Sequence, residues 1–250
     1  MIRIIFFLNK NYLKLDYEKN KTQIKAKGKY SFGDEFDGYE INIINEKDKY
    51  DFESSIDLNN NLILVKEIDY NKNKDSYSKI KLKGNYIKNK DIKIEHALYS
   101  ENENTISISN LILSKNFKVK DINSLELNYL NNNKNLNDIK ILKKKNKYVL
   151  ISKNFDGESL VKKLLDGDSK NSFLKVFNNL NSEITLNLVK FYLGNQSNLK
   201  NIKGKVIVKN NIIKSGKIDA LLNEKNKFSL NIKTNSNNEK TTNLYMRNQS

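Results

Sequence analysis

The segment Glu183-Ile184-Thr185-Leu186-Asn187-Leu188 alternates polar and apolar residues, and this alternation decides the fold class of the 250-residue chain. Successive side chains of a β-strand point to opposite faces of a sheet, so Ile184, Leu186 and Leu188 share one face. Thr185 and Asn187 share the other. The same pattern begins at 205–209, 217–222 and 228–233. Together these segments predict an antiparallel sheet with one apolar face and one polar face.

The alternation continues through most of the chain before this segment. It predicts strands at 12–17, 22–30, 39–43, 50–58, 62–68, 77–86, 92–99, 105–113, 117–119, 125–129, 139–142 and 147–152. Polar turns rich in Asn or Lys separate several of them, at 59–61, 131–135 and 143–147. The pattern Ile24-Lys-Ala-Lys-Gly28-Lys-Tyr30 recurs as Ile80-Lys-Leu-Lys-Gly84-Asn-Tyr86. If this match is not chance, it indicates repeating meander units that extend a sheet by accretion, each with a bend marked by glycine.

Helical spacing occurs in one region, 156–180. Asp156 can cap a helix there, Leu160, Val161, Leu164 and Leu165 follow at helical spacing, and a second short helix fits 173–177. The predicted fold is therefore mainly β, a long twisted antiparallel sheet curled into an open groove, with a short helical insertion. We divide the chain into a meander segment (1–152) and a helical insertion followed by a second β segment (153–250), joined as one continuous unit.

The chain is basic, with a formal net charge of +16. Such a field attracts nucleic acid, anionic membranes or acidic polysaccharides. The lysines are dispersed along the strands, which is typical of a solvated sheet face. Only two residues are Arg, the side chain best suited to reading bases and phosphates, and this argues against a dedicated nucleic-acid protein.

No motif for catalysis or metal binding stands out. The chain has no Cys and a single His, His96, in a strand-like stretch. It has no phosphate-binding glycine loop, nucleophile elbow or HExxH motif. We expect no enzyme activity, no cofactor and no metal. The apolar run at 2–8 is too short to cross a bilayer and is expected to form a strand, with a clipped membrane anchor as the alternative.

The C-terminal part resembles a known family. Phe155-Asp156 leads the helical region, and the strand at 184–188, Leu199-Lys-Asn-Ile-Lys-Gly204, Gly216-Lys-Ile-Asp-Ala220, Phe228-Ser-Leu-Asn-Ile232 and Thr241-Thr-Asn-Leu-Tyr245 follow it. This order resembles the AsmA-like superfamily of bacterial envelope proteins, of the YhdP and TamB type, over residues 150–245. The motifs are degenerate, and the N-terminal anchor helix of that family does not match this sequence. An internal or C-terminal fragment of a larger protein is expected.

The resemblance implies a non-enzymatic protein of the periplasm, anchored in the inner membrane, that moves phospholipid toward the outer membrane. Acyl chains would lie along an apolar β-groove, with other envelope proteins as further partners. From the alternation, the expected lining residues are Ile184, Leu186, Leu188, Val206, Val208, Ile218, Ala220, Phe228, Leu230 and Ile232.

Two other classes of function fit the same sequence. In the first, two sheets pack their apolar faces together as a closed sandwich, and the protein is an adhesion or interaction module. In the second, the positive charge makes it a polyanion-binding domain, whose affinity falls steeply with salt.

Overall fold

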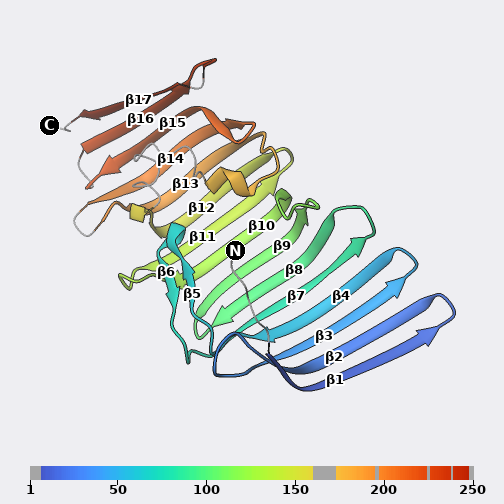
Figure 1. Cartoon of the computed structure of the whole chain (residues 1–250). Coiled ribbons are helices and arrows are strands. Elements are labelled where there is room, and N and C mark those ends of the chain that lie inside the picture. Colours follow the sequence, from blue (N-terminus) through green and yellow to red (C-terminus); the bar gives the residue numbers. More distant parts are fainter. Residues whose placement is uncertain (1–6, 160–172, 195–196, 224–225, 238, 248–250) are drawn as a thin grey trace.

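A computed structural model of the chain describes residues 7–159, 173–194, 197–223, 226–237 and 239–247, and it is dominated by one large sheet (Figure 1). Fifteen strands form this sheet, and a two-stranded sheet accompanies it. The large sheet comprises β1 (Phe7–Glu18), β2 (Lys21–Ser31), β3 (Asp37–Glu46), β4 (Lys49–Asp57), β7 (Ser78–Ile87), β8 (Ile92–Glu101), β9 (Asn104–Leu113), β10 (Val119–Leu130), β11 (Leu136–Lys144), β12 (Lys147–Asp156), β13 (Ser182–Tyr192), β14 (Asn198–Lys209), β15 (Ile212–Leu222), β16 (Asn226–Thr234) and β17 (Lys240–Arg247).

The prediction of a mainly β chain is confirmed, and the large sheet is open, not closed into a barrel. Its strand order follows the chain order, except that β5 (Ile63–Val65) and β6 (Tyr70–Lys72) pair with each other outside it. Short turns join most neighbours, and several contain Asn or Lys with positive φ, such as Lys47, Asn89 and Lys145. Asn tolerates this conformation better than most residues, which explains part of its abundance in the turns.

The prediction of a wholly antiparallel sheet is wrong at one pair. Strands β12 and β13 run parallel, with Leu150 opposite Leu186, so the sheet is mixed. A parallel pair requires a connection that crosses from one end of the sheet to the other, and residues 157–181 provide it. The predicted segment boundary at 152/153 lies inside β12, which pairs with β13 on both sides of it.

The predicted helical insertion falls largely on residues 160–172, which lie outside the described residues. The described part of the connection contains a short 3-10 helix, η3 (Phe173–Val176), where the sequence predicts a second short helix. Beyond η3, Phe177 bridges Val119 of β10, and the Asn178 N–H donates to the Val119 carbonyl at 2.7 Å. The end of the connection is thereby tied to the sheet.

The strand predicted at 62–68 is too long. Only Ile63–Val65 is extended, and the 3-10 helix η1 (Lys66–Ile68) follows. Asp69 then takes a left-handed conformation with φ of 51°. The strand predicted at 125–129 is part of β10, which begins at Val119, the only residue of the strand predicted at 117–119 that lies in a strand.

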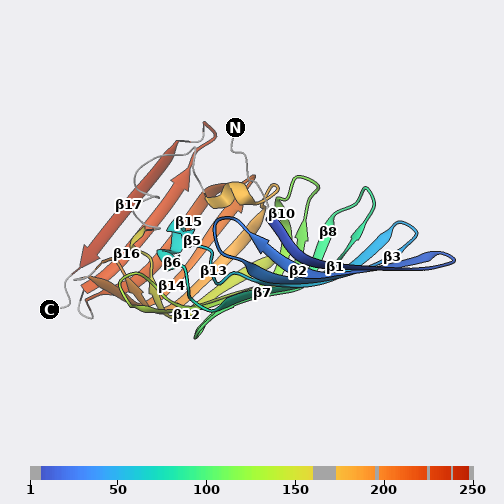
Figure 2. The same ribbon diagram turned by 60° about the horizontal axis from the view of Figure 1, so that its bottom comes forward.

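The repeated glycines lie inside strands, next to bulges. Gly28 faces the bulge between Asn9 and Tyr12 of β1, and Gly84 follows a register shift between β7 and β8. A Cβ at Gly84 would lie 2.2 Å from the carbonyl oxygen of Lys93, so the close approach of the two backbones requires glycine. Bulges increase the local twist of a sheet. Figure 2 shows the sheet strongly twisted.

Candidate functional site

One row of side chains crosses the entire sheet on a single face. Cross-strand pairing joins one residue from each of the fifteen strands, and we call this set the apolar row. Its members, in strand order, are Leu13, Ala26, Ile41, Ser54, Leu82, Ala97, Ile108, Leu125, Ile141, Leu150, Leu186, Gly204, Ile218, Leu230 and Leu244. At a strand spacing of about 4.8 Å the row is roughly 67 Å long. Only Ser54 and Gly204 interrupt its hydrocarbon side chains.

The ten predicted lining residues lie on the face of the apolar row. Leu186, Ile218 and Leu230 belong to the row itself. Neighbouring rows on the same face pair Ile184 with Val206, and Ala220 with Phe228. The other three are Leu188, Val208 and Ile232. The pairing aligns them with Ile202, Ile213 and Gly216, which were not among the predicted lining residues.

Coverage of this apolar face decreases toward both edges of the sheet. Leu188, Val208 and Ala220 are buried, and the other seven predicted residues are partly buried. At the edges, 69% of Leu13 and 52% of Leu244 are exposed. A sheet with one apolar face normally packs that face on another layer. In this sheet the apolar face is open to solvent near β1 and β17.

A segment between β4 and β7, which we call the strap (residues 58–77), covers part of the middle of the apolar face. It contains β5, η1 and β6, and Figures 1 and 2 show it over the sheet. Its Tyr70 is 1% exposed and packs edge-on against Tyr99 and Tyr129, with ring centroids 6.2 and 5.7 Å apart. Leu127, Ile139 and Phe155 complete this cluster.

Hydrogen bonds attach the buried side of the strap to the large sheet. The Tyr70 hydroxyl donates to the Glu101 carboxylate and lies 2.8 Å from the Tyr99 hydroxyl. Burial, together with the hydrogen bond to Glu101, raises the pKa of Tyr70 above its ordinary value. The Tyr129 hydroxyl donates to the Ile68 carbonyl at 2.9 Å. These bonds join the strap to β8 and β10.

Lys72 closes the strap on itself. Its side chain is fully buried, and its ammonium donates to the backbone carbonyls of Asn59, Asn61 and Asn73 at 2.8, 2.8 and 2.7 Å. Three acceptors use all three ammonium donors. Burial lowers the pKa of Lys72, because desolvation disfavours the charged form. Sequence analysis did not identify Tyr70, Lys72 or Glu101, since nothing in their spacing signals long-range polar contacts.

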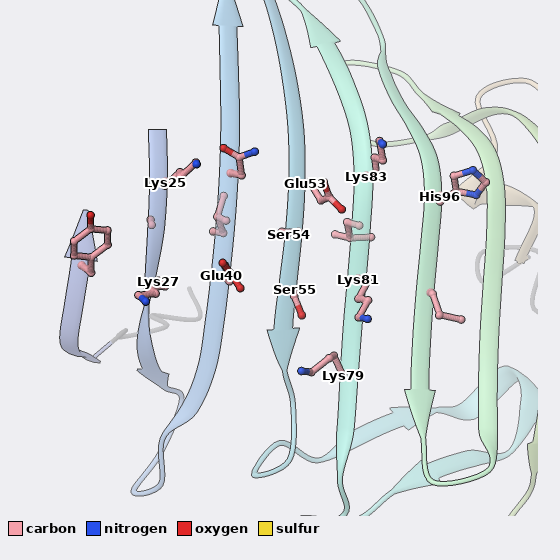
Figure 3. Close-up of a pocket in the computed structure, with 16 residues that line it drawn as sticks. Lys25, Lys27, Glu40, Glu53, Ser54, Ser55, Lys79, Lys81, Lys83 and His96 are labelled. Atoms are coloured by element: carbon pink, nitrogen blue, oxygen red, sulfur yellow. The ribbon is translucent and has the colours of Figure 1, made fainter. Parts of the chain in front are cut away.

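A hollow of about 820 Å³ lies on the opposite, polar face, over β1–β4, β7 and β8. Figure 3 shows lysines from β2 and β7 on either side of Glu40 and Glu53, which come from β3 and β4. A second hollow of about 950 Å³ lies on the polar face of β14–β17. These hollows differ from the apolar groove that the sequence predicts, and that groove stays a prediction.

Neither metal nor membrane features were found in the described part of the chain. No group of three or more His, Asp or Glu side chains there could hold a metal ion. His96 is exposed on the polar face, where it lines the first hollow. Within the same ranges, no helix combines the length and hydropathy needed to span a bilayer.

Two surfaces of the large sheet are candidates for ligand binding: the apolar face, which bears the apolar row, and the polar face, which bears the two hollows. Comparison of the chain with protein-family models, with curated proteins and with solved structures found no match.

Proposed function

We propose that this protein binds lipid acyl chains along the apolar row, as a lipid-carrying segment of the AsmA-like type in the bacterial envelope. The observation that carries the proposal is the edge-to-edge continuity of the row. In most strands a register error of one residue would place a polar side chain in the row; β12 is an exception, because Leu150 lies between Val149 and Ile151. Such continuity over fifteen strands favours an elongated apolar partner.

The energetics of the face suit a chain-like ligand. Burial of each methylene contributes roughly 0.8 kcal/mol, so an acyl chain gains affinity from length alone. The row contains no charged side chain, and its only hydroxyl is that of Ser54. It therefore offers no hydrogen-bond pattern that would select one lipid. We expect acyl chains to move along the row without being held at one position, while their head groups remain in water.

The alternative of a closed sandwich receives less support. A sandwich needs a second sheet of similar extent packed on the first. In the described residues the second sheet has two strands, β5 and β6, and the strap packs over the middle of the sheet. The open sheet leaves room for an apolar partner beyond the strap, above β1–β4.

Lipid retention tests the proposal. The segment is expressed in a bacterial periplasm and purified, and its lipids are extracted and identified by mass spectrometry. Phospholipid should accompany the wild type and be lost in the Leu186→Asp/Leu230→Asp variant. A matched control, Thr185→Asp/Asn231→Asp, adds the same charges to the polar face of the same two strands, and it should retain lipid. Circular dichroism checks that strand content is unchanged in both variants.

Two results would reject this function. One is a folded wild type that carries no phospholipid. The other is equal lipid loss in the two aspartate variants, because it would mean that charge, and not the apolar row, governs retention.

A further inference from the structure

The hollow on the polar face of β1–β4, β7 and β8 is lined by lysines and by other polar side chains that come from different strands. Lys25 and Lys27 lie on β2, and Lys79, Lys81 and Lys83 lie on β7. Between these two lysine-bearing strands, β3 and β4 contribute a floor of carboxylates, an amide and a hydroxyl (Figure 3). The floor residues are Glu40, Asn42, Glu53 and Ser55.

The pairing register sets the dimensions of the hollow. Lys25 pairs with Asn42, Asn42 with Glu53, and Glu53 with Lys83, so one cross-strand row reads cation, amide, carboxylate, cation. The next row runs from Lys27 through Glu40 and Ser55 to Lys81. The two lysine-bearing strands are three strand spacings apart, about 14 Å. A ligand must be extended to contact both.

Most of the charges in the hollow are available to a ligand. Lys79 is paired with Asp57 at 3.1 Å. Among the described residues, Lys25, Lys81 and Lys83 have no ion-pair partner within 4.0 Å, and neither do Glu40 and Glu53. Lys27 lies over the ring of Tyr12, 5.7 Å from its centroid. Tyr12 is half exposed and forms one side of the hollow.

We propose that this hollow binds an acidic polysaccharide. Lysines on both sides pair with the anionic groups of the sugars, whereas the carboxylates of the floor accept hydrogen bonds from sugar hydroxyls. The exposed ring of Tyr12 offers a flat apolar surface for a sugar ring. Single-stranded DNA fits less well, because its sugars have no free hydroxyl along the strand to donate to Glu40 and Glu53, and the hollow contains no Arg.

This site is independent of the lipid proposal, since it uses the other face of the sheet. The probe is a galacturonate oligosaccharide, which carries one carboxylate on each sugar, with single-stranded DNA as the comparison ligand. Affinity is measured by isothermal titration calorimetry at two salt concentrations. The wild type should bind the oligosaccharide, with affinity that falls as salt rises.

Two pairs of substitutions separate the site from the overall charge. Lys25→Gln/Lys83→Gln should weaken oligosaccharide binding about three- to tenfold, given the usual worth of exposed ion pairs. Lys203→Gln/Lys233→Gln removes the same charge from the polar face of β14 and β16 and should change affinity by less than about twofold. Equal weakening by both pairs would overturn the proposal, because net charge would then explain the binding.

Glu53→Leu gives the sharper test, because it removes the hydrogen-bond acceptor, whereas Gln would keep an accepting oxygen. If Glu53 accepts hydrogen bonds from sugar hydroxyls, its loss should weaken oligosaccharide binding about threefold while DNA binding becomes tighter. Tighter binding of both ligands would overturn the proposal in favour of a simple polyanion surface. A wild type that does not bind the oligosaccharide at all would also overturn it.

Discussion

Replacing Lys72 with Met should destabilise the folded conformation of the strap. The substitution keeps the length of the side chain but removes three hydrogen bonds to the carbonyls of Asn59, Asn61 and Asn73. Those carbonyls lie around a fully buried ammonium, so after the substitution they would lack this donor. An unsatisfied buried polar group costs about 1–3 kcal/mol.

The net magnitude follows from two opposing terms. Three lost bonds at about 1–3 kcal/mol each give roughly 3–9 kcal/mol. The burial of the ammonium itself carries a desolvation cost of several kcal/mol, which the Met variant avoids. The lowered pKa of Lys72 reflects that cost. We therefore expect a net destabilisation of the strap of about 3 kcal/mol.

Hydrogen exchange is the measurement of choice, because it separates local opening of the strap from unfolding of the sheet. Amides of residues 58–77 should exchange roughly 100-fold faster in the Met variant, whereas those of β13 and β14 should not change. Lys74→Met is the matched control, since Lys74 is exposed in the same strap. The reasoning is refuted if the two variants protect the strap equally.

Two further substitutions test local features of the sheet. Gly84→Val should destabilise the chain by about 2–4 kcal/mol in urea unfolding, since its Cβ would clash with the Lys93 carbonyl, whereas Gly33→Val, with no atom near its Cβ, should be almost neutral. Burial alone would raise the pKa of Asp121, but the hydrogen bond and charge of Lys143 hold that pKa below its ordinary value. Ionised Asp121 therefore stabilises the fold above pH about 4 and loses this effect as pH falls through its folded pKa, so Asp121→Asn should be destabilising at pH 7 and neutral in acid.

Alternation alone predicts the strands well, because one face is apolar in nearly every strand. The faces of Leu186, Ile218 and Leu230 follow directly from the period of two, and the register aligns them. The pattern cannot distinguish a strand of the main sheet from a short extended piece. Residues 62–68 alternate as the others do, yet they lie in the strap.

Long-range polar contacts explain what alternation misses. Tyr70 reaches Glu101 and Tyr129 reaches Ile68 across 31 and 61 residues of sequence, so no local pattern reveals them. The parallel pairing of β12 and β13 is hidden for a similar reason. It depends on the path of the connection at 157–181, and the composition of either strand is compatible with both directions.

Sequence analysis also does not identify the polar hollow, although the alternation places its polar residues on the exposed face of the strands. Lys25 and Lys83 are 58 positions apart in the chain, and only the register across β2, β3, β4 and β7 aligns them with Glu53. In the sequence alone, the dispersed lysines therefore indicate only a solvated face of the sheet. In the folded sheet they form two lines with carboxylates between them.

The two proposed sites use alternate residues of the same strands, so single substitutions can test each site separately. In β7, Leu82 belongs to the apolar row, and its neighbours Lys81 and Lys83 face the polar hollow. A closed sandwich would hide one of these faces, whereas an open sheet leaves both available at β1–β4. Leu82→Asp should therefore reduce lipid retention and spare oligosaccharide affinity, and Lys83→Gln should do the reverse. If each variant lost both activities with strand content intact, the two faces would not act independently, because side chains of opposite orientation would then contribute to a single site.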